Sequence, residues 1–158
     1  MGAQDAAVVA LVEAVKFESD GREFYLRAAD RVLHPVAKAV FRALAEDEKD
    51  HIRRVREIYE ELKSRPGWPE TSAMVARRAG VEDAFRTALE HLDREVPRDA
   101  DALDALTKAE EMELKGLGFY RDRLAKASCG AEAEFYRQLV AEEEIHLQTI
   151  RKAIEELS

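Results

Sequence analysis

The chain has 158 residues, of which 37% are charged and 46% are apolar, and its formal net charge is −8. This length supports one domain with its own core, and the composition suits a helix-rich globular protein rather than a disordered or fibrous one. The acidic balance, with no basic stripe, argues against a nucleic-acid partner. The sequence shows neither a signal-peptide pattern nor an apolar span long enough for a membrane, so we expect a cytoplasmic protein that binds no membrane.

The N-terminal part of the chain predicts two long helices. Apolar residues recur in steps of three and four, which indicates helices over about 4–33 and 36–63. Pro35 disfavours helical geometry at the residue before it and suits the first turn of the next helix. A tight reversal near Pro35 therefore makes these two helices a hairpin.

The rest of the chain predicts a crossover followed by a second hairpin. Residues 64–99 begin with two prolines and a glycine, and their weaker pattern indicates two short helices that divide at Gly80. Long helices are predicted again over about 100–128 and 131–157, the first with an aspartate cap. We therefore predict an all-α fold in which residues 1–158 form a single domain, a four-helix bundle of two helical hairpins joined by a long crossover with short helices.

A pattern of potential metal ligands occurs twice, at an offset of 95 residues. LAEDEKDH in the second predicted helix and LVAEEEIH in the fourth each contain Glu-x-x-His, and ESDGREFY and ELKGLGFY in the other two helices each contribute a glutamate. The six candidate ligands are Glu18, Glu48, His51, Glu113, Glu143 and His146. Each Glu-x-x-His pair lies on one helix face. At ~1.5 Å per residue, the four glutamates lie roughly 20–24 Å from their hairpin turns, so they should converge at mid-bundle.

The charge of this cluster predicts what it binds. Several carboxylates in a dry core cost several kcal/mol each unless cations or protons neutralise them. Four carboxylates carry four negative charges, which two divalent ions balance. Carboxylate oxygen with imidazole nitrogen suits iron, manganese or zinc. We predict two iron ions, because iron couples readily to dioxygen or peroxide, with manganese, zinc or a mixed pair as alternatives.

With these residues the chain resembles the ferritin-like di-iron carboxylate proteins, in particular the rubrerythrin branch. EFYLRAA and FRALAEDEKDH look like segments of the first two helices of that branch, and such bundles take a Glu from each of two helices and Glu-x-x-His from each of the other two. The resemblance implies a ferritin-like four-helix bundle, two terminal ligands for each iron, and two bridging glutamates. These are Glu18 and His51 for the first iron, Glu113 and His146 for the second, and Glu48 and Glu143 as the bridges.

The resemblance also implies supporting residues for the catalytic centre. Tyr25 and Tyr120, each seven residues after a ligand glutamate, are expected to donate hydrogen bonds to ligand carboxylates. Glu110, one turn before the third-helix ligand, is a possible extra ligand or a solvated glutamate. Gly116 departs from the family pattern, because rubrerythrins have a further glutamate there that is associated with peroxidase chemistry.

The predicted function is that of an oxidoreductase, peroxidase-like or ferroxidase-like, which reduces hydrogen peroxide or dioxygen while ferrous iron is oxidised and so suits defence against oxidative stress. A single cysteine, Cys129, excludes the Cys-x-x-Cys pairs of a rubredoxin-like site, so electrons are expected from an external donor protein. A homodimer is also expected. Iron binding and storage of the ferritin type, and a metal-free helical interaction module, are the alternatives. Oxidation of an organic substrate is less favoured, because the sequence shows no obvious pocket element.

Overall fold

The computed structural model describes residues 2–70, 80–92 and 94–158, and this part of the chain is helical without any strand. The helices are α1 (Ala3–Arg31), α2 (Pro35–Ser64), α3 (Gly80–Glu90), α4 (Ala100–Ala125) and α5 (Gly130–Leu157). The predicted all-α, ferritin-like bundle is therefore confirmed. The second predicted crossover helix is α3, whereas residues 71–79, which cover most of the first, lie outside the described part. None of the described helices is both long and apolar enough to cross a membrane.

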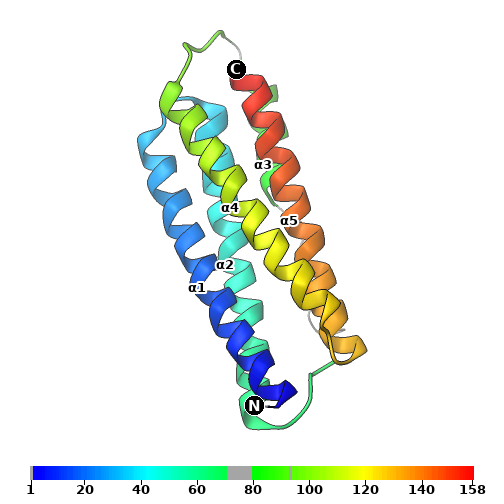
Figure 1. Ribbon diagram of the computed structural model, residues 1–158. Coiled ribbons are helices and arrows are strands. Elements are labelled where there is room, and N and C mark those ends of the chain that lie inside the picture. Colours follow the sequence, from blue (N-terminus) through cyan, green and yellow to red (C-terminus); the bar gives the residue numbers. More distant parts are fainter. Residues whose placement is uncertain (1, 71–79, 93) are drawn as a thin grey trace.

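The four long helices form two antiparallel hairpins. Helix α1 packs along α2, and α4 packs along α5, while α1 also faces α4 and α2 faces α5 (Figure 1). The crossover helix α3 packs against α2 and α5. This arrangement encloses one interior that all four long helices share.

Local sequence signals fix where the helices begin. Pro35 occupies the first turn of α2, where a missing backbone N–H costs nothing, and the His34 side chain caps that helix. Asp99 caps α4 by accepting a hydrogen bond from the backbone N–H of Ala102 at 3.0 Å. Its other oxygen accepts from the backbone N–H groups of Leu33 and His34 at 2.8 and 3.0 Å. The start of α4 is thereby tied to the turn between α1 and α2.

The apolar core is divided into two clusters by a polar layer. Along α2, Leu44 belongs to one cluster and Val55 to the other, and both are fully buried. Along α4, Leu106 belongs to the cluster that contains Leu44, and Tyr120 belongs to the cluster that contains Val55. The candidate ligands of each helix lie between these positions, which places them at mid-bundle as their distances from the turns predicted.

Candidate metal centre

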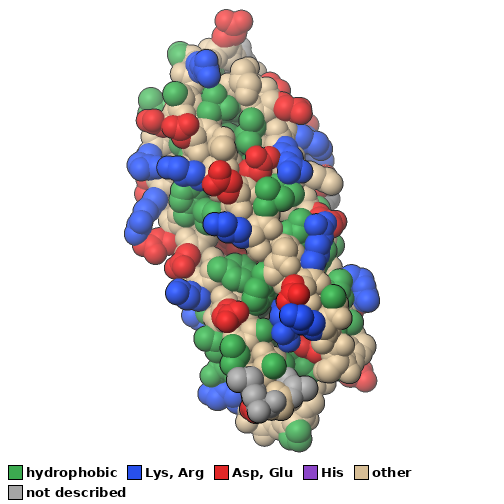
Figure 2. All heavy atoms as spheres, viewed as in Figure 1, with side chains coloured by type: hydrophobic (Ala, Val, Ile, Leu, Met, Phe, Trp, Pro, Cys, Tyr) green, Lys and Arg blue, Asp and Glu red, His purple; other side chains and the backbone are tan. Residues whose placement is uncertain are grey.

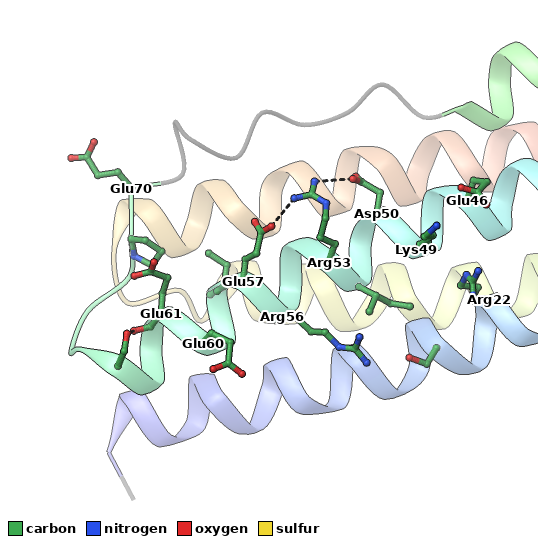
Figure 3. Close-up of a pocket in the computed structure, with 15 residues that line it drawn as sticks. Arg22, Glu46, Lys49, Asp50, Arg53, Arg56, Glu57, Glu60, Glu61 and Glu70 are labelled. Carbon is green, nitrogen blue, oxygen red and sulfur yellow. Dashed lines mark hydrogen bonds and ion pairs between the residues drawn. The ribbon is translucent and has the colours of Figure 1, made fainter.

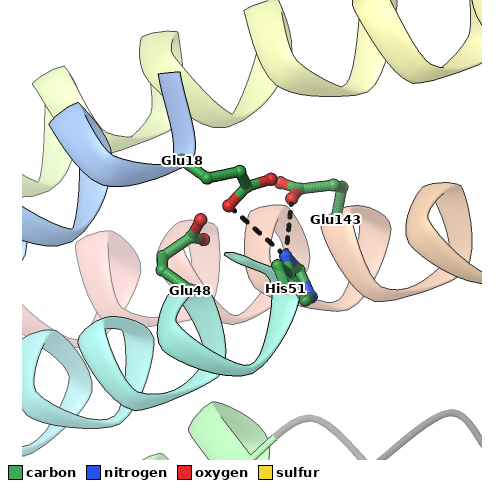
Figure 4. A group of neighbouring side chains, drawn as sticks. All are labelled: Glu18, Glu48, His51 and Glu143. Carbon is green, nitrogen blue, oxygen red and sulfur yellow. Dashed lines mark ion pairs between the residues drawn. The ribbon is translucent and has the colours of Figure 1, made fainter. Parts of the chain in front are cut away.

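All six candidate ligands meet in the polar layer at mid-bundle, and none is more than 4% exposed. They form two groups, and within each group the possible ligand atoms lie within 4.8 Å of one another. The first group is Glu18, Glu48, His51 and Glu143 (Figure 4), and the second is Glu48, Glu113, Glu143 and His146. Both groups contain Glu48 and Glu143, so the two glutamates expected to bridge are the two that the groups share.

Both histidines present Nδ1 to the carboxylates. His51 Nδ1 lies 3.4 Å from Glu18 Oε2 and 3.3 Å from Glu143 Oε1 (Figure 4). His146 Nδ1 lies 3.4 Å from Glu48 Oε1. The two rings are stacked, with centroids 5.4 Å apart and planes inclined by 17°. The histidines therefore enter the cluster side by side, one for each group.

Several buried polar atoms of the cluster have no hydrogen-bond partner among the described residues. They include Nδ1 of both histidines and one carboxylate oxygen of each of the four glutamates. Buried polar atoms are normally paired, and leaving them unpaired is costly. Metal ions would satisfy these atoms together, and a donor set of carboxylate oxygen and imidazole nitrogen fits iron, manganese or zinc.

The electrostatics of the cluster demand positive charge. Burial lowers the pKa of each histidine, but the facing carboxylates, Glu18 for His51 and Glu113 for His146 foremost, outweigh it and raise each pKa to about 10. Burial and the negative charge of Glu113 hold the pKa of Glu143 well above its ordinary value. Without metal the cluster thus retains protons, and metal binding has to release them.

The two tyrosines predicted to support the site do contact ligand carboxylates. Tyr25 Oη donates to Glu113 Oε1, and Tyr120 Oη donates to Glu18 Oε1, both at 2.6 Å. Each tyrosine therefore reaches the glutamate of the facing helix. Burial, followed by the nearby glutamates, raises the pKa of both phenols well above 10. Both hydroxyls consequently remain hydrogen-bond donors at any ordinary pH.

Two carboxylates that the sequence analysis did not identify face the outer nitrogens of the histidines. Asp47 Oδ2 lies 3.1 Å from His146 Nε2, and Glu142 Oε1 lies 3.6 Å from His51 Nε2. The hydrogen bond at His146 Nε2 fixes the orientation of that ring and leaves its Nδ1 free for a metal, whereas Glu142 contacts His51 Nε2 at ion-pair distance only. The sequence contains a pattern that could have identified this pair of carboxylates. Asp47 and Glu142 directly precede the shared glutamates Glu48 and Glu143 and stand 95 positions apart, as the ligands do.

These two carboxylates are held by different partners. Glu142 Oε2 pairs with a guanidinium nitrogen of Arg54 at 2.5 Å, and Arg54, only 1% exposed, also pairs with Asp50 at 3.1 Å. Asp47 instead accepts hydrogen bonds from the backbone N–H groups of Gly80 and Val81 at 3.0 and 3.2 Å. The N-terminus of the crossover helix α3 is thus attached to the candidate metal centre through Asp47.

Glu110, the possible extra ligand, lies outside both groups. Its Oε2 pairs with Arg151 Nε at 2.8 Å. Gly116 does border the cluster, since a Cβ built there would lie 3.7 Å from Glu143 Oε2. The structure therefore brings together the six principal candidates and leaves Glu110 in a surface ion pair.

A groove of about 1250 Å³ lies apart from the six candidate ligands, along α1 and α2 (Figure 3). Its side chains are mostly charged, and they pair with one another: Arg53 contacts Asp50 at 2.9 Å and Glu57 at 2.8 Å. None of the six candidate ligands is among its described lining residues. This groove is a solvated surface feature rather than part of the metal centre.

Four long helices around buried glutamates and histidines, grouped so that they could hold metal ions, define the ferritin-like carboxylate class. Within this class, the family model described as Rubrerythrin matches residues 10–154. The chain belongs to the rubrerythrin family, and the matched range contains all six candidate ligands. No curated protein matches the chain, and no solved structure matches it.

Proposed function

We propose that this protein is a di-iron oxidoreductase that reduces hydrogen peroxide or dioxygen while ferrous iron is oxidised. The observation that carries the proposal is the pair of four-residue groups that share Glu48 and Glu143. Shared carboxylates would hold two ions side by side, which is the arrangement needed to deliver two electrons to one small molecule. Family membership supports the same conclusion.

The donor set favours iron through its charge and its chemistry. Four carboxylates balance two divalent ions, and the neutral imidazoles of His51 and His146 complete the ligand set without adding charge. When bound, a ferrous pair supplies the two electrons that, with two protons, convert hydrogen peroxide to two molecules of water. Manganese and zinc fit the same atoms, but zinc lacks this redox chemistry.

The protein's own residues hold and orient this centre. Tyr25 and Tyr120 restrain the terminal glutamates through their 2.6 Å hydrogen bonds, and Asp47 restrains the ring of His146. The two apolar clusters pack on either side of this polar layer. Such preorganisation limits the rearrangement that oxidation would otherwise require.

Return of the centre to its ferrous state requires electrons from elsewhere. These 158 residues contain one cysteine, Cys129, which is exposed and remote from the cluster in sequence, so they contain no rubredoxin-type site. We therefore include an external electron-donor protein in the proposed function. As a separate part of the proposal, the assembled form is a homodimer.

The decisive experiment measures iron per chain after anaerobic loading with ferrous iron and desalting. The parent should retain two irons per chain, and Glu48→Ala/Glu143→Ala should retain close to none. The matched control is Glu60→Ala/Glu155→Ala, which removes two exposed glutamates from the same helices and should retain the parent content. A parent that is folded and binds less than one iron would refute the proposal.

A peroxide or dioxygen pulse on the loaded protein then tests the reaction. Oxidation of two ferrous ions per peroxide, followed by turnover when a one-electron donor is supplied, is the expected result. Continued uptake of iron far beyond two per chain by a very large particle would instead indicate storage of the ferritin type. Size exclusion of the same sample distinguishes that particle from a dimer.

A further inference from the structure

A cavity of about 390 Å³, half open to solvent, lies between α1 and α4, against the carboxylate cluster. One glutamate from each of the four long helices lines it, and the other walls come from α1 and α4 alone. Figure 2 views the molecule from the α1 and α4 side and shows hydrophobic side chains between the charged ones on this face. This cavity reaches four of the six candidate ligands, Glu18, Glu48, Glu113 and Glu143.

The walls of the cavity repeat the duplication of the sequence. Phe17 of α1 covers Gly116 of α4, where a Cβ would lie 3.5 Å from the ring, and Met112 of α4 covers Gly21 of α1, where a Cβ would lie 3.6 Å from the methyl group. Phe17 and Met112 stand 95 positions apart, as do the two glycines. Each glycine therefore leaves room for an apolar side chain from the facing helix, and the space beside the carboxylates is walled by carbon.

The charges at the mouth of the cavity cancel. Asp20 and Lys115 are exposed lining residues that also stand 95 positions apart, with opposite signs. The mouth thus attracts neither anions nor cations as a class. Deeper inside, Phe17 and Phe119 pack edge to face with centroids 5.1 Å apart, which extends the aromatic wall. A neutral molecule with a largely apolar surface matches these walls, because a charged group placed against them would lose its hydration without a partner.

The volume indicates the size of the occupant. Sites for small organic molecules occupy roughly 300–1,000 Å³ and are mostly apolar with a few polar groups at one end. A water molecule takes up about 30 Å³ of liquid, and dioxygen or peroxide needs little more. The cavity is therefore about ten times larger than the proposed oxidants require, yet it falls within the range for organic ligands.

We propose that the cavity between α1 and α4 binds a neutral, largely apolar organic molecule, with one end against the four glutamates. The inference goes beyond the proposed function and rests on it in one respect, that metal ions neutralise those carboxylates. The sequence alone disfavours oxidation of an organic substrate, because it shows no obvious pocket element. The cavity lies where Phe17 meets Gly116 and Met112 meets Gly21, between two helices that are distant in the sequence.

The test uses the full chain loaded with zinc, which is redox-silent, and 1-octanol as the probe. Saturation-transfer NMR and calorimetry should show one saturable site per chain. Octylammonium, its positively charged relative, should bind at least about tenfold more weakly than octanol, because the zinc ions already neutralise the carboxylates and burial of its charge is unfavourable. Gly116→Leu places a side chain in the cavity and should weaken octanol binding by about tenfold or more.

Gly118→Leu is the matched control, because Gly118 lies on the same helix and nothing approaches its Cβ position. It should bind octanol as the parent does. Should Gly116→Leu fail to fold, Gly116→Ala replaces it, since its methyl group would meet Phe17 and Glu143 at ordinary contact distances and alanine favours the helix. That variant should weaken octanol binding by a smaller factor.

Two outcomes overturn the proposal: absence of a saturable octanol site in the parent, or equal octanol affinity in the parent and both Gly116 variants. Elemental analysis of the same samples separates this proposal from the preceding one. Two zinc ions without octanol binding would remove the cavity proposal alone. Octanol binding by a chain that retains neither zinc nor iron would remove the di-iron proposal and the premise that metal ions neutralise the carboxylates, while the organic-ligand site would stand.

Discussion

Tyr120 and Tyr136 are neighbouring buried tyrosines, and among the described residues only the hydroxyl of Tyr120 makes a hydrogen bond. Their rings lie 6.1 Å apart and both residues are 0% exposed. Tyr120 Oη donates to Glu18 at 2.6 Å, whereas Tyr136 Oη has no hydrogen-bond partner among the described residues. Replacement of each by phenylalanine removes one buried oxygen atom, which lies near Glu18 in Tyr120 and near Arg123 in Tyr136. We expect Tyr120→Phe to destabilise the metal-free protein and Tyr136→Phe to leave its stability nearly unchanged.

The magnitudes follow from these contacts. A hydrogen bond to a charged group contributes about 1.5–3 kcal/mol, and its removal leaves a buried carboxylate oxygen unpaired, so Tyr120→Phe should cost about 2 kcal/mol. Burial raises the pKa of Tyr136 to about 12, although Arg123 partly offsets this rise. The phenol of Tyr136 is therefore neutral, and loss of its unpaired hydroxyl should change the free energy of unfolding by less than about 1 kcal/mol.

Urea unfolding of the metal-free protein at neutral pH, followed by circular dichroism, measures both effects. With a slope of about 2 kcal/mol per molar urea, Tyr120→Phe should lower the midpoint by about 1 M. Tyr25→Phe should lower it equally, because Tyr25 makes a bond of the same length to Glu113. Equal shifts for Tyr120→Phe and Tyr136→Phe would refute the reasoning, since the hydrogen bond would then contribute nothing.

Three further predictions concern the surroundings of the metal centre. Both site histidines have pKa values raised from 6.5 to about 10. Their protonation therefore stabilises the metal-free fold fully below about pH 6.5, and the urea midpoint should fall as the pH rises towards 10, with a smaller change when zinc is bound. Arg54→Met leaves buried carboxylates without a cation and should cost about 3–5 kcal/mol in thermal unfolding, whereas Arg53→Met, at an exposed ion pair, should change stability by no more than about 0.5 kcal/mol. Asp47→Ala removes the partner of His146 Nε2 and should weaken zinc binding at one of two sites by roughly 10–100-fold in chelator competition; Asp30→Ala, at an exposed position, should leave both affinities unchanged.

The helices and the candidate ligands could be predicted because independent signals agree. The apolar periodicity over 36–63 marks a helix that the structure places at Pro35–Ser64, since proline and the loop that follows Ser64 define its ends sharply. Duplication then distinguishes Glu48 and Glu143 from the many solvated glutamates, because chance rarely repeats a spaced pattern in two helices. The end of α4 was less well defined: the helix stops at Ala125 rather than near 128.

The residues behind the ligands could not be predicted in the same way. Helical periodicity shows which side chains face inward, but it does not show which carboxylate reaches which nitrogen. Asp47 meets the backbone of Gly80, 33 positions away, and no local pattern links them. Glu110 occupies an inward position by periodicity, yet it pairs with Arg151. The cavity depends on side chains from helices that are distant in the sequence.

The different supports of the two histidines break the symmetry that the duplication created. Glu142, behind His51, is paired with the full positive charge of Arg54, whereas Asp47, behind His146, accepts hydrogen bonds from two neutral backbone amides and pairs with no Lys or Arg among the described residues. The position of the second half that corresponds to Arg54 is Thr149. In a buried, weakly screened environment a fixed charge alters the potential at nearby ions. Two ions with matching ligands would therefore differ in reduction potential, and electrons would have a preferred side from which to leave.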